Sequence, residues 1–244
     1  LAKFQFLFQD ATFLRVIRNT FCMGVLNLVT STIMAILFAI LLNEIRATKS
    51  KKVIQTISYL PHFLSWIIVT GILHDALSST GIINELLMKA GIIDRAIDFF
   101  AHPKYFWWIV AFANCWKETG WNAIIYLSAI TSIDPSLYEA ANIDGAGRWQ
   151  KLRYFFLPLT AGTTETNVIL SITGGMKSFA LFYMLTGGGP GTATRVVSML
   201  IYDTAFMDYK FYKALTMSTV LFGIILTLVL LGRWLGSRRN RVGG

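Results

Sequence analysis

Long runs of apolar residues alternate along the chain with short segments that carry most of the charge. The first run, residues 19–42, contains 24 residues without an acidic or basic side chain, which exceeds the roughly 20 residues that a helix needs to cross a bilayer. Four further apolar runs follow, some of them interrupted by polar side chains. The pattern predicts an all-α fold, a polytopic membrane helix bundle with five spans, at about 19–42, 53–77, 105–133, 160–185 and 214–234.

The segments outside these spans differ in polarity. Residues 1–18 mix aromatic side chains with charges and are too polar to span, so we expect an extracytoplasmic segment that lies at the membrane surface. Residues 19–236 form the transmembrane domain, and residues 237–244 form a basic cytoplasmic tail. Pro61 is expected to kink the second span, and the Gly174-Gly175 pair to interrupt the fourth.

The composition also indicates a membrane protein. Hydrophobic residues make up 55% of the chain and charged residues 14%, whereas soluble domains carry about 25% charged residues. The net charge of +9 is spread over loops and the C-terminus, without the single basic stripe of a nucleic-acid-binding surface. Cys22 and Cys115 lie far apart in apolar runs without metal-ligand spacing, so we expect buried thiols.

The distribution of Lys and Arg predicts the orientation of the bundle. Of the 22 such residues, the five-span topology places eleven in about 50 cytoplasmic residues and nine in about 73 outer residues. Because cytoplasmic loops are enriched in Lys and Arg, we expect the segment 134–158 and the C-terminus inside the cell and Leu1 outside.

A polar segment broken by glycines, residues 134–158, separates the third span from the fourth. Alanine and leucine favour helix there, whereas Asp144-Gly145 and Gly147 interrupt it. Pro158 is expected to end the second of the two helices, because it lacks an amide hydrogen and clashes with the preceding turn. The segment therefore predicts a cytoplasmic helical hairpin, with helices at about 136–143 and 148–156.

This hairpin resembles the EAA loop of permease subunits in bacterial ABC importers, whose pattern is E-A-A, three residues, G, nine residues, then I-x-L-P. The residues that match are Glu139, Ala140, Ala141, Gly145, Leu157 and Pro158, while Phe155 stands where the family usually has Ile. Two further stretches, LPHFLSWIIV at 60–69 and LTGGGPGTAT at 185–194, look like the carbohydrate-uptake branch of type I importers. The chain is similar in these motifs to maltose-type permeases and to complex-oligosaccharide permeases such as the alginate type.

The resemblance implies a function, a location and partners. The chain would be the transmembrane permease subunit of an ATP-driven oligosaccharide importer in the bacterial cytoplasmic (inner) membrane. The implied partners are a second homologous permease, two ATPase subunits and an extracytoplasmic solute-binding protein. ATP and magnesium would bind the ATPase subunits, and we expect neither a cofactor nor an enzymatic site in this chain. Such permeases have a six-helix core, so five spans predict a further helix before Leu1.

The resemblance also assigns the hairpin to coupling with the ATPase. The coupling residues would be Glu139, Ala140, Ala141, Asp144 and Gly145. We expect Gly145 to permit a tight turn and Glu139 to fix the hairpin through charge-assisted hydrogen bonds.

The substrate pathway, by the same resemblance, lies along the third and fourth spans. Aligning on the hairpin and on the G-G-P motif carries the sugar contacts of maltose-type permeases onto Asn114, Lys117, Glu118, Trp121, Ser171, Gly174, Gly175 and Ser178. Asn and Ser side chains can bond hydroxyl groups, and Trp121 offers a flat face to a pyranose ring. The alternative is that these polar groups pair between helices.

Two lysines in the predicted pathway, Lys117 and Lys177, suggest an acidic substrate such as a uronate-containing oligosaccharide. A buried ammonium without an anion is costly, and adjacent Lys117 and Glu118 point about 100° apart on a helix. We therefore expect the substrate, or an acid on another subunit, to complete the site. Neutralisation by Glu118 and Glu165 is the alternative.

Two other classes of protein are the alternatives: an ion-coupled secondary transporter or channel subunit, and a membrane-embedded enzyme. An enzyme would need a nucleophile with a base, or a metal cluster, and the sequence shows no such set of residues. An ion-coupled secondary transporter or a channel subunit would also be polytopic, but neither needs a hairpin for an ATPase or an external binding protein. The GMKS stretch at 175–178 is not a phosphate-binding loop, because Met176 stands directly before Lys177 where such a loop requires Gly. His62, His74 and His102 are widely separated, so we expect polar interior or interfacial residues and not a metal site.

Overall fold

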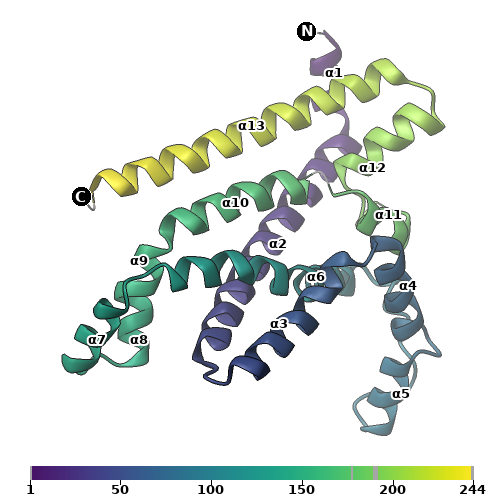
Figure 1. Ribbon diagram of the computed structural model, residues 1–244. Helices are drawn as coiled ribbons and strands as arrows, with labels where there is room; N and C mark the ends of the chain where they lie inside the picture. Colours follow the sequence, from purple (N-terminus) through teal and green to yellow (C-terminus); the bar gives the residue numbers. More distant parts are fainter. Residues whose placement is uncertain (1, 177, 189–191, 243–244) are drawn as a thin grey trace. The chain divides into compact units, whose positions relative to one another are not determined.

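The computed structural model describes residues 2–176, 178–188 and 192–242, and all regular structure in these residues is helical (Figure 1). In chain order the elements are α1 (Ala2–Gln9), α2 (Ala11–Glu44), α3 (Thr48–Phe63), α4 (Trp66–Leu77), α5 (Ile82–Lys89), α6 (Pro103–Thr131), α7 (Pro135–Ile143), α8 (Arg148–Lys151), the π-helical turn η1 (Leu152–Phe156), α9 (Leu157–Leu159), α10 (Ala161–Met176), α11 (Ala180–Thr186), α12 (Val197–Tyr202), the π-helical turn η2 (Asp203–Met207) and α13 (Phe211–Val242).

The chain divides into two compact units. The first contains Leu1–Asn27, Leu64–Ala113 and Thr173–Thr227, and the second contains Leu28–Phe63, Asn114–Ile172 and Leu228–Gly244. The long helices α2, α6, α10 and α13 each contribute residues to both units.

The first long helix, α2, begins at Ala11, earlier than the predicted start of the first span at residue 19. The Asp10 carboxylate accepts hydrogen bonds from the amides of Thr12 (2.9 Å) and Phe13 (3.4 Å), which satisfies free donors at the helix start. Residues 11–18 therefore belong to α2, and within the described residues the short α1 precedes it. Its 34 residues extend roughly 51 Å, more than the thickness of a hydrocarbon core.

The second predicted span is two helices, not one kinked helix. Pro61 lies in the last turn of α3, which ends at Phe63. Ser65 then caps α4, its hydroxyl accepting from the amide of Ile68 at 3.4 Å. A missing amide at Pro61 and a capping serine four residues later together favour a break over a kink.

Three stretches of described helix are long and apolar enough to cross a membrane, namely Ala11–Glu44, Trp66–Lys89 and Phe211–Gly236. The pair of helices α10 and α11, which are bent by 43° relative to each other, is a fourth candidate if the two are counted as one span. Helix α6 is 29 residues long but includes several aromatic and charged side chains, which lower its hydropathy. The count of five spans stays a prediction.

The predicted interruption of the fourth span at Gly174-Gly175 is wrong, because α10 continues through both glycines to Met176 and α11 starts only at Ala180. Helix α11 ends at Gly187, which has a φ of +59°, a left-handed conformation that glycine adopts without strain. The predicted stop at the glycine-rich run is therefore confirmed for Gly187, while residues 189–191 lie outside the described part.

Each unit has its own apolar core. In the first, α4 and α11 lie side by side (Figure 1), and the core residues are Met23, Phe106, Val110, Leu181, Phe182, Leu185, Val196 and Met199. In the second, the fully buried Ala35 and Ala39 of α2 share a cluster with Ala123 and Tyr126 of α6. Small residues let helix backbones approach closely, as is typical of membrane helices.

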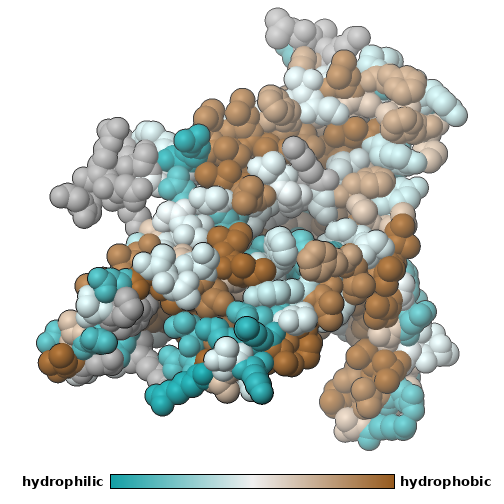
Figure 2. All heavy atoms as spheres, viewed as in Figure 1, coloured by the Kyte–Doolittle hydropathy of each residue, from teal (hydrophilic) through white to brown (hydrophobic). Residues whose placement is uncertain are grey.

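Hydrophobic and hydrophilic side chains gather on different parts of the surface (Figure 2). Figure 2 shows hydrophobic side chains over most of α13 on the face in view. Hydrophilic side chains gather at the turn between α2 and α3, where Arg46, Lys49 and Lys52 are exposed.

One buried amide ties a loop of the first unit to α2. The Nδ2 atom of Asn19, which is 1% exposed, donates to the carbonyl oxygens of Thr192 (3.1 Å), Ala193 (3.1 Å) and Arg195 (3.2 Å). One residue further along α2, the hydroxyl of Thr20 accepts from the amide of Val197 at 2.9 Å. The loop that precedes α12 is therefore held by α2.

Replacing Asn19 by Ala should destabilise the protein, because three carbonyl groups lose their shared donor at a buried site. We expect a loss of about 1–3 kcal/mol, measured as a lower unfolding temperature of the purified chain in detergent. The same change at the exposed Asn43 is the control. Equal unfolding temperatures for the two variants would show that the amide of Asn19 does not hold the loop.

Candidate functional site

The hairpin predicted from the sequence is present. Helix α7 starts at Pro135, and the carboxylate of Asp134 accepts from the amide of Ser136 at 2.9 Å. This hydrogen bond holds the pKa of Asp134 below its usual value. Because folding lowers the pKa, the cap stabilises α7 above the unfolded-state pKa and is lost as the pH falls through the folded-state pKa.

A left-handed residue makes the turn of the hairpin. Gly145 has a φ of +72°, which confirms that a glycine is needed there. The amide of Ala146 donates to the carbonyl oxygen of Ala141 at 2.9 Å, and the amide of Gly147 donates to the side chain of Gln150 at 2.7 Å. The turn is thus held by backbone and amide hydrogen bonds.

The second arm of the hairpin is less regular than expected. Helix α8 passes into the π-helical turn η1 and then into α9, which ends at Leu159, one residue beyond Pro158. The wider π-helical turn places Pro158 near the start of a new helical segment, where its missing amide hydrogen is tolerated.

Four of the five predicted coupling residues lie on the surface of this hairpin. Glu139, Ala140, Asp144 and Gly145 are exposed, and Ala141 is buried. Within the described part of the chain the Glu139 carboxylate makes no hydrogen bond, so the bonds described above, and not Glu139, fix the hairpin. Large apolar side chains of the hairpin are also exposed, and we call four of them the hairpin face: Leu137, Ile143, Trp149 and Tyr154.

The second unit contains a close approach of α3 to α6. A Cβ atom on Gly120 would overlap the carbonyl group of Ser58, so only glycine fits at this position of α6. His62 follows Ser58 by one helical turn on α3, and Trp121 follows Gly120 directly on α6. The contact therefore brings the end of α3 against the middle of α6.

Lys117 meets the end of α3 at this point. Its side chain is buried, and its ammonium group donates to the carbonyl oxygen of His62 and, at 3.4 Å, to that of Pro61. These carbonyls belong to the last turn of α3, where helical partners are lacking. A cation at a helix C-terminus also interacts favourably with the helix dipole.

The charge of Lys117 is balanced within the chain. Its Nζ atom lies 3.6 Å from Oε1 of Glu118, and Oε2 of Glu118 lies 2.8 Å from Nδ1 of His62. Since an ionised carboxylate only accepts hydrogen bonds, Nδ1 of His62 carries the hydrogen. The alternative considered for this lysine, neutralisation by Glu118, therefore agrees with the geometry, although the two residues are adjacent on α6.

Trp121 stacks on His62. The two rings are 4.4 Å apart and nearly parallel, at 4°, and Phe63 meets the indole edge-on at 5.7 Å. Trp121 nevertheless keeps 39% of its surface exposed. One face of the indole is therefore covered by His62, while part of the Trp121 side chain stays accessible.

The other predicted pathway residues are not part of this cluster. Asn114 and Ser171 are half-buried residues of the second unit, whereas Gly174, Gly175 and Ser178 belong to the first. Lys177 lies outside the described residues. Glu165 was the other acid considered for the two lysines. Its carboxylate lies close to Gly236 of α13, and the residue lines a separate cavity of about 300 Å³.

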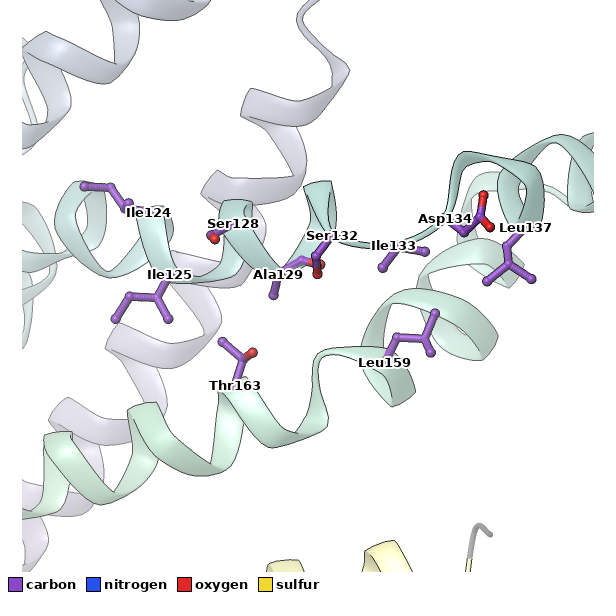
Figure 3. Close-up of a pocket in the computed structure, with 10 residues that line it drawn as sticks. All are labelled: Ile124, Ile125, Ser128, Ala129, Ser132, Ile133, Asp134, Leu137, Leu159 and Thr163. Carbon is purple, nitrogen blue, oxygen red and sulfur yellow. The ribbon is translucent and has the colours of Figure 1, made fainter.

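A larger cavity of about 770 Å³ lies beside the hairpin in the second unit (Figure 3). Its walls are apolar residues with the hydroxyls of Ser128, Ser132 and Thr163, and it reaches the hairpin at Asp134 and Leu137. None of the predicted pathway residues lines it. Its position means that a movement of α7 relative to α6 would change its shape.

Sequence reasoning missed two residues of the α3–α6 cluster. His62 was predicted to be an interior or interfacial polar residue, and Gly120 was not considered. A glycine inside a long apolar helix indicates a close backbone approach, and that signal could have identified Gly120. Among the described residues no three His, Cys, Asp or Glu side chains gather as a metal site would require.

Comparison with known proteins places these features in a family. Residues 28–241 match the family described as "Binding-protein-dependent transport system inner membrane component". The chain is 33% identical, over all 244 residues and 76% of the relative, to the polygalacturonan/rhamnogalacturonan transport system permease protein YteP of Bacillus subtilis (strain 168).

Two solved structures are similar over nearly the whole chain. One is a bacterial ABC transporter involved in the import of the acidic polysaccharide alginate, with a TM-score of 0.90, 33% identity and coverage of 98% of this chain and 83% of that chain. The other is a bacterial alginate ABC transporter in complex with an alginate pentasaccharide-bound periplasmic protein, with a TM-score of 0.89, 35% identity and coverage of 96% and 82%.

Substituting Gly120 by Ala should separate α3 from α6, because the new methyl group overlaps the Ser58 carbonyl. We expect a destabilisation of about 1–3 kcal/mol, as for other overpacked sites. Gly162 of α10 has open space at its Cβ position, so Gly162→Ala is the matched control and should be neutral or stabilising. Thermal unfolding in detergent measures both, and an equally stable Gly120→Ala would contradict the close approach.

Proposed function

The chain belongs to the family of binding-protein-dependent transport system inner membrane components, and we propose that it is the permease subunit of an ATP-driven importer of uronate-containing oligosaccharides. As a member of this family it is a multi-pass subunit of a carbohydrate ABC importer in the bacterial inner membrane, and it is not an enzyme. The acidic substrate, the partner subunits and the roles of individual residues are the parts that we propose.

One observation supports an acidic substrate most directly. The relative that matches the whole chain is named for polygalacturonan and rhamnogalacturonan, and the two similar structures are of alginate transporters. Polygalacturonan is a polymer of a uronic acid, and alginate is described as acidic. Lys117 does not support an acidic substrate, because its ammonium group lies beside the Glu118 carboxylate and donates hydrogen bonds to two carbonyl oxygens.

The hairpin is the part that we assign to coupling. Exposed large apolar side chains clustered on a short polar segment are typical of an interaction surface, and Ile143 is 86% exposed. We propose that α7 docks in a cleft of a cytoplasmic ATPase and that the hairpin face and the exposed carboxylate of Glu139 make the contact. An ion-coupled transporter or a channel would have no use for such a surface.

The coupling then works as a rigid-body movement. The hairpin turn is closed by its own hydrogen bonds, so a displacement of the docked helix is passed on to α6 and α10. When two ATPase subunits close on ATP and magnesium, the attached helices move with them, as expected for alternating access. A second homologous permease completes the pathway, and an extracytoplasmic binding protein delivers the sugar. This chain itself holds neither nucleotide nor metal in the proposal.

Charge changes on the hairpin should uncouple the importer without unfolding it. We expect Ile143→Asp and Glu139→Lys each to lower substrate-stimulated ATPase activity and uptake at least ~10-fold, which corresponds to about 1.4 kcal/mol of coupling. Ile92→Asp, at another exposed isoleucine far along the chain from the hairpin, is the control. Wild-type stimulation in both hairpin variants would rule out this docking surface.

The charge of the substrate can be tested with one pair of sugars. Oligogalacturonides and their methyl esters have the same length and ring structure but differ in charge. We expect the importer, reconstituted with its ATPase, second permease and binding protein, to take up the acidic form at least ~10-fold faster, a difference of about 1.4 kcal/mol. Equal uptake, or preference for the ester, would contradict an acidic substrate and leave a neutral oligosaccharide.

A further inference from the structure

Aromatic side chains are exposed together where α1 lies beside the start of α13 (Figure 1). We call this group the aromatic collar, and its members are Phe4, Phe8, Phe206, Tyr209, Phe211 and Tyr212. An ion pair joins its two parts, since Nζ of Lys213 lies 3.2 Å from Oδ2 of Asp10. Each ring of the collar is between 37% and 77% exposed. Aromatic surface that is exposed together in this way marks a site of contact with protein or membrane.

The turn that carries most of the collar has a defined shape. The amide of Lys210 donates to the carbonyl oxygen of Thr204, and the amide of Asp208 donates to that of Asp203, both at 2.9 Å. Tyr209 has a φ of +55°, the only positive φ among the described residues other than glycine. A tyrosine in this left-handed conformation is strained, and such strain occurs most often at functional sites. The backbone of the turn therefore holds the ring of Tyr209 outward, where it is 77% exposed.

The collar is the exposed end of a longer row of rings in the first unit. Phe211 lies 6.3 Å from Phe206, and Phe206 lies 5.3 Å from Tyr202, measured between ring centroids. Tyr202 in turn contacts Phe179 at 5.1 Å and Tyr183 at 5.5 Å. The row connects the collar to α12 and to α11.

The length of α13 places the collar at a membrane surface. The stretch of this helix that can cross a membrane, Phe211–Gly236, has 26 residues and is roughly 39 Å long. A bilayer is about 30 Å thick in its hydrocarbon core and about 40–45 Å with its headgroup regions. The opposite end of the helix leads into the basic tail at 237–244. The collar, at the first residues of the stretch, therefore lies at the depth of the lipid headgroups.

The residue types of the collar fit phospholipid better than they fit a protein partner. Tyrosine is enriched at membrane surfaces, where its ring is in apolar surroundings and its hydroxyl in water. Lys210 follows Tyr209, and its ammonium group lies 3.8 Å from the Asp208 carboxylate, an exposed pair that contributes little. Such a lysine can reach a lipid phosphate while its methylene groups stay beside the rings. Lysine is depleted in contacts between proteins.

We propose that the aromatic collar binds phospholipid at the membrane surface where α13 begins. The rings of Phe206, Tyr209 and Phe211 lie at the boundary of headgroups and acyl chains, and Lys210 lies beside a lipid phosphate. This contact sets the depth of the first turns of α13 and, through the pair with Asp10, of α1 and the start of α2. The proposal does not depend on which sugar is transported.

The test measures how close the turn lies to lipid. A cysteine in place of Met207, in a chain with Cys22 and Cys115 changed to Ala, carries a fluorophore and leaves every ring of the collar in place. The chain is reconstituted with its partner subunits in vesicles of phosphatidylcholine and phosphatidylglycerol that contain spin-labelled lipid. A spin label near the headgroup should quench this probe at least ~3-fold more than one at the end of the acyl chain, as expected for a group ~5–10 Å deep. The same probe at Ser136, an exposed residue of the hairpin, is the control and should be quenched weakly by both.

Two substitutions separate the ring of Tyr209 from the shape of the turn. Asparagine tolerates the left-handed conformation, so Tyr209→Asn removes the ring and keeps the turn. We expect this change, and Lys210→Glu, which repels a phosphate, each to lower headgroup quenching of the Met207 probe at least ~2-fold. Tyr209→Trp keeps an interfacial ring and should preserve the quenching.

Three results would overturn the proposal. A Met207 probe that neither spin label quenches would show that protein covers the collar. Loss of the quenching when the binding protein is added would show that the collar is the docking surface of that protein. Unchanged quenching in both Tyr209→Asn and Lys210→Glu would show that the collar does not hold the turn in the membrane. The preference for acidic sugars is measured separately, as a ratio of uptake rates, so either proposal can fail without the other.

Discussion

The ammonium group of Lys117 at the end of α3 is the interaction on which the candidate site depends. Pro61 lies in the last turn of this helix and α4 does not start until Trp66, so carbonyl groups at the end of α3 have no helical partners. A buried cation on the neighbouring helix meets two of them. Breaking a buried pair of this kind costs more than an exposed one, since an uncompensated charge remains.

The close approach at Gly120 makes this arrangement possible, and the neighbouring groups follow from it. With α3 held against α6, Glu118 balances Lys117 and turns its other oxygen toward His62, whose ring covers one face of Trp121. The result is a cluster of polar and aromatic side chains within a membrane subunit, in which Trp121 stays partly exposed.

The local features of this chain were predictable from its sequence. The hairpin, its left-handed Gly145 and the end of α11 at Gly187 depend on short-range effects, namely helix propensity and the special conformations of glycine. The start of α2 at Ala11, before the predicted first span, was not predicted, because Asp10 was not recognised as its cap, although an Asp before a helix is a known signal.

The cluster itself was predictable only in part. Lys117, Glu118 and Trp121 were identified through a family resemblance, but their partners come from a segment more than 50 residues away in the chain. No pattern in one sequence says that α3 ends beside Lys117, so a lysine that looked unpaired suggested an acidic ligand. Such pairings depend on how segments far apart in the chain pack together. Hydrophobic periodicity and helix propensity describe only neighbouring residues, so they do not predict this packing.

Thermal unfolding of Lys117→Met in detergent tests this account most directly, because methionine keeps most of the side-chain volume and removes the ammonium group. The prediction is a destabilisation of about 3 kcal/mol, because the buried carbonyl groups at the end of α3 and the Glu118 carboxylate lose their cation. A variant as stable as the wild type would contradict it.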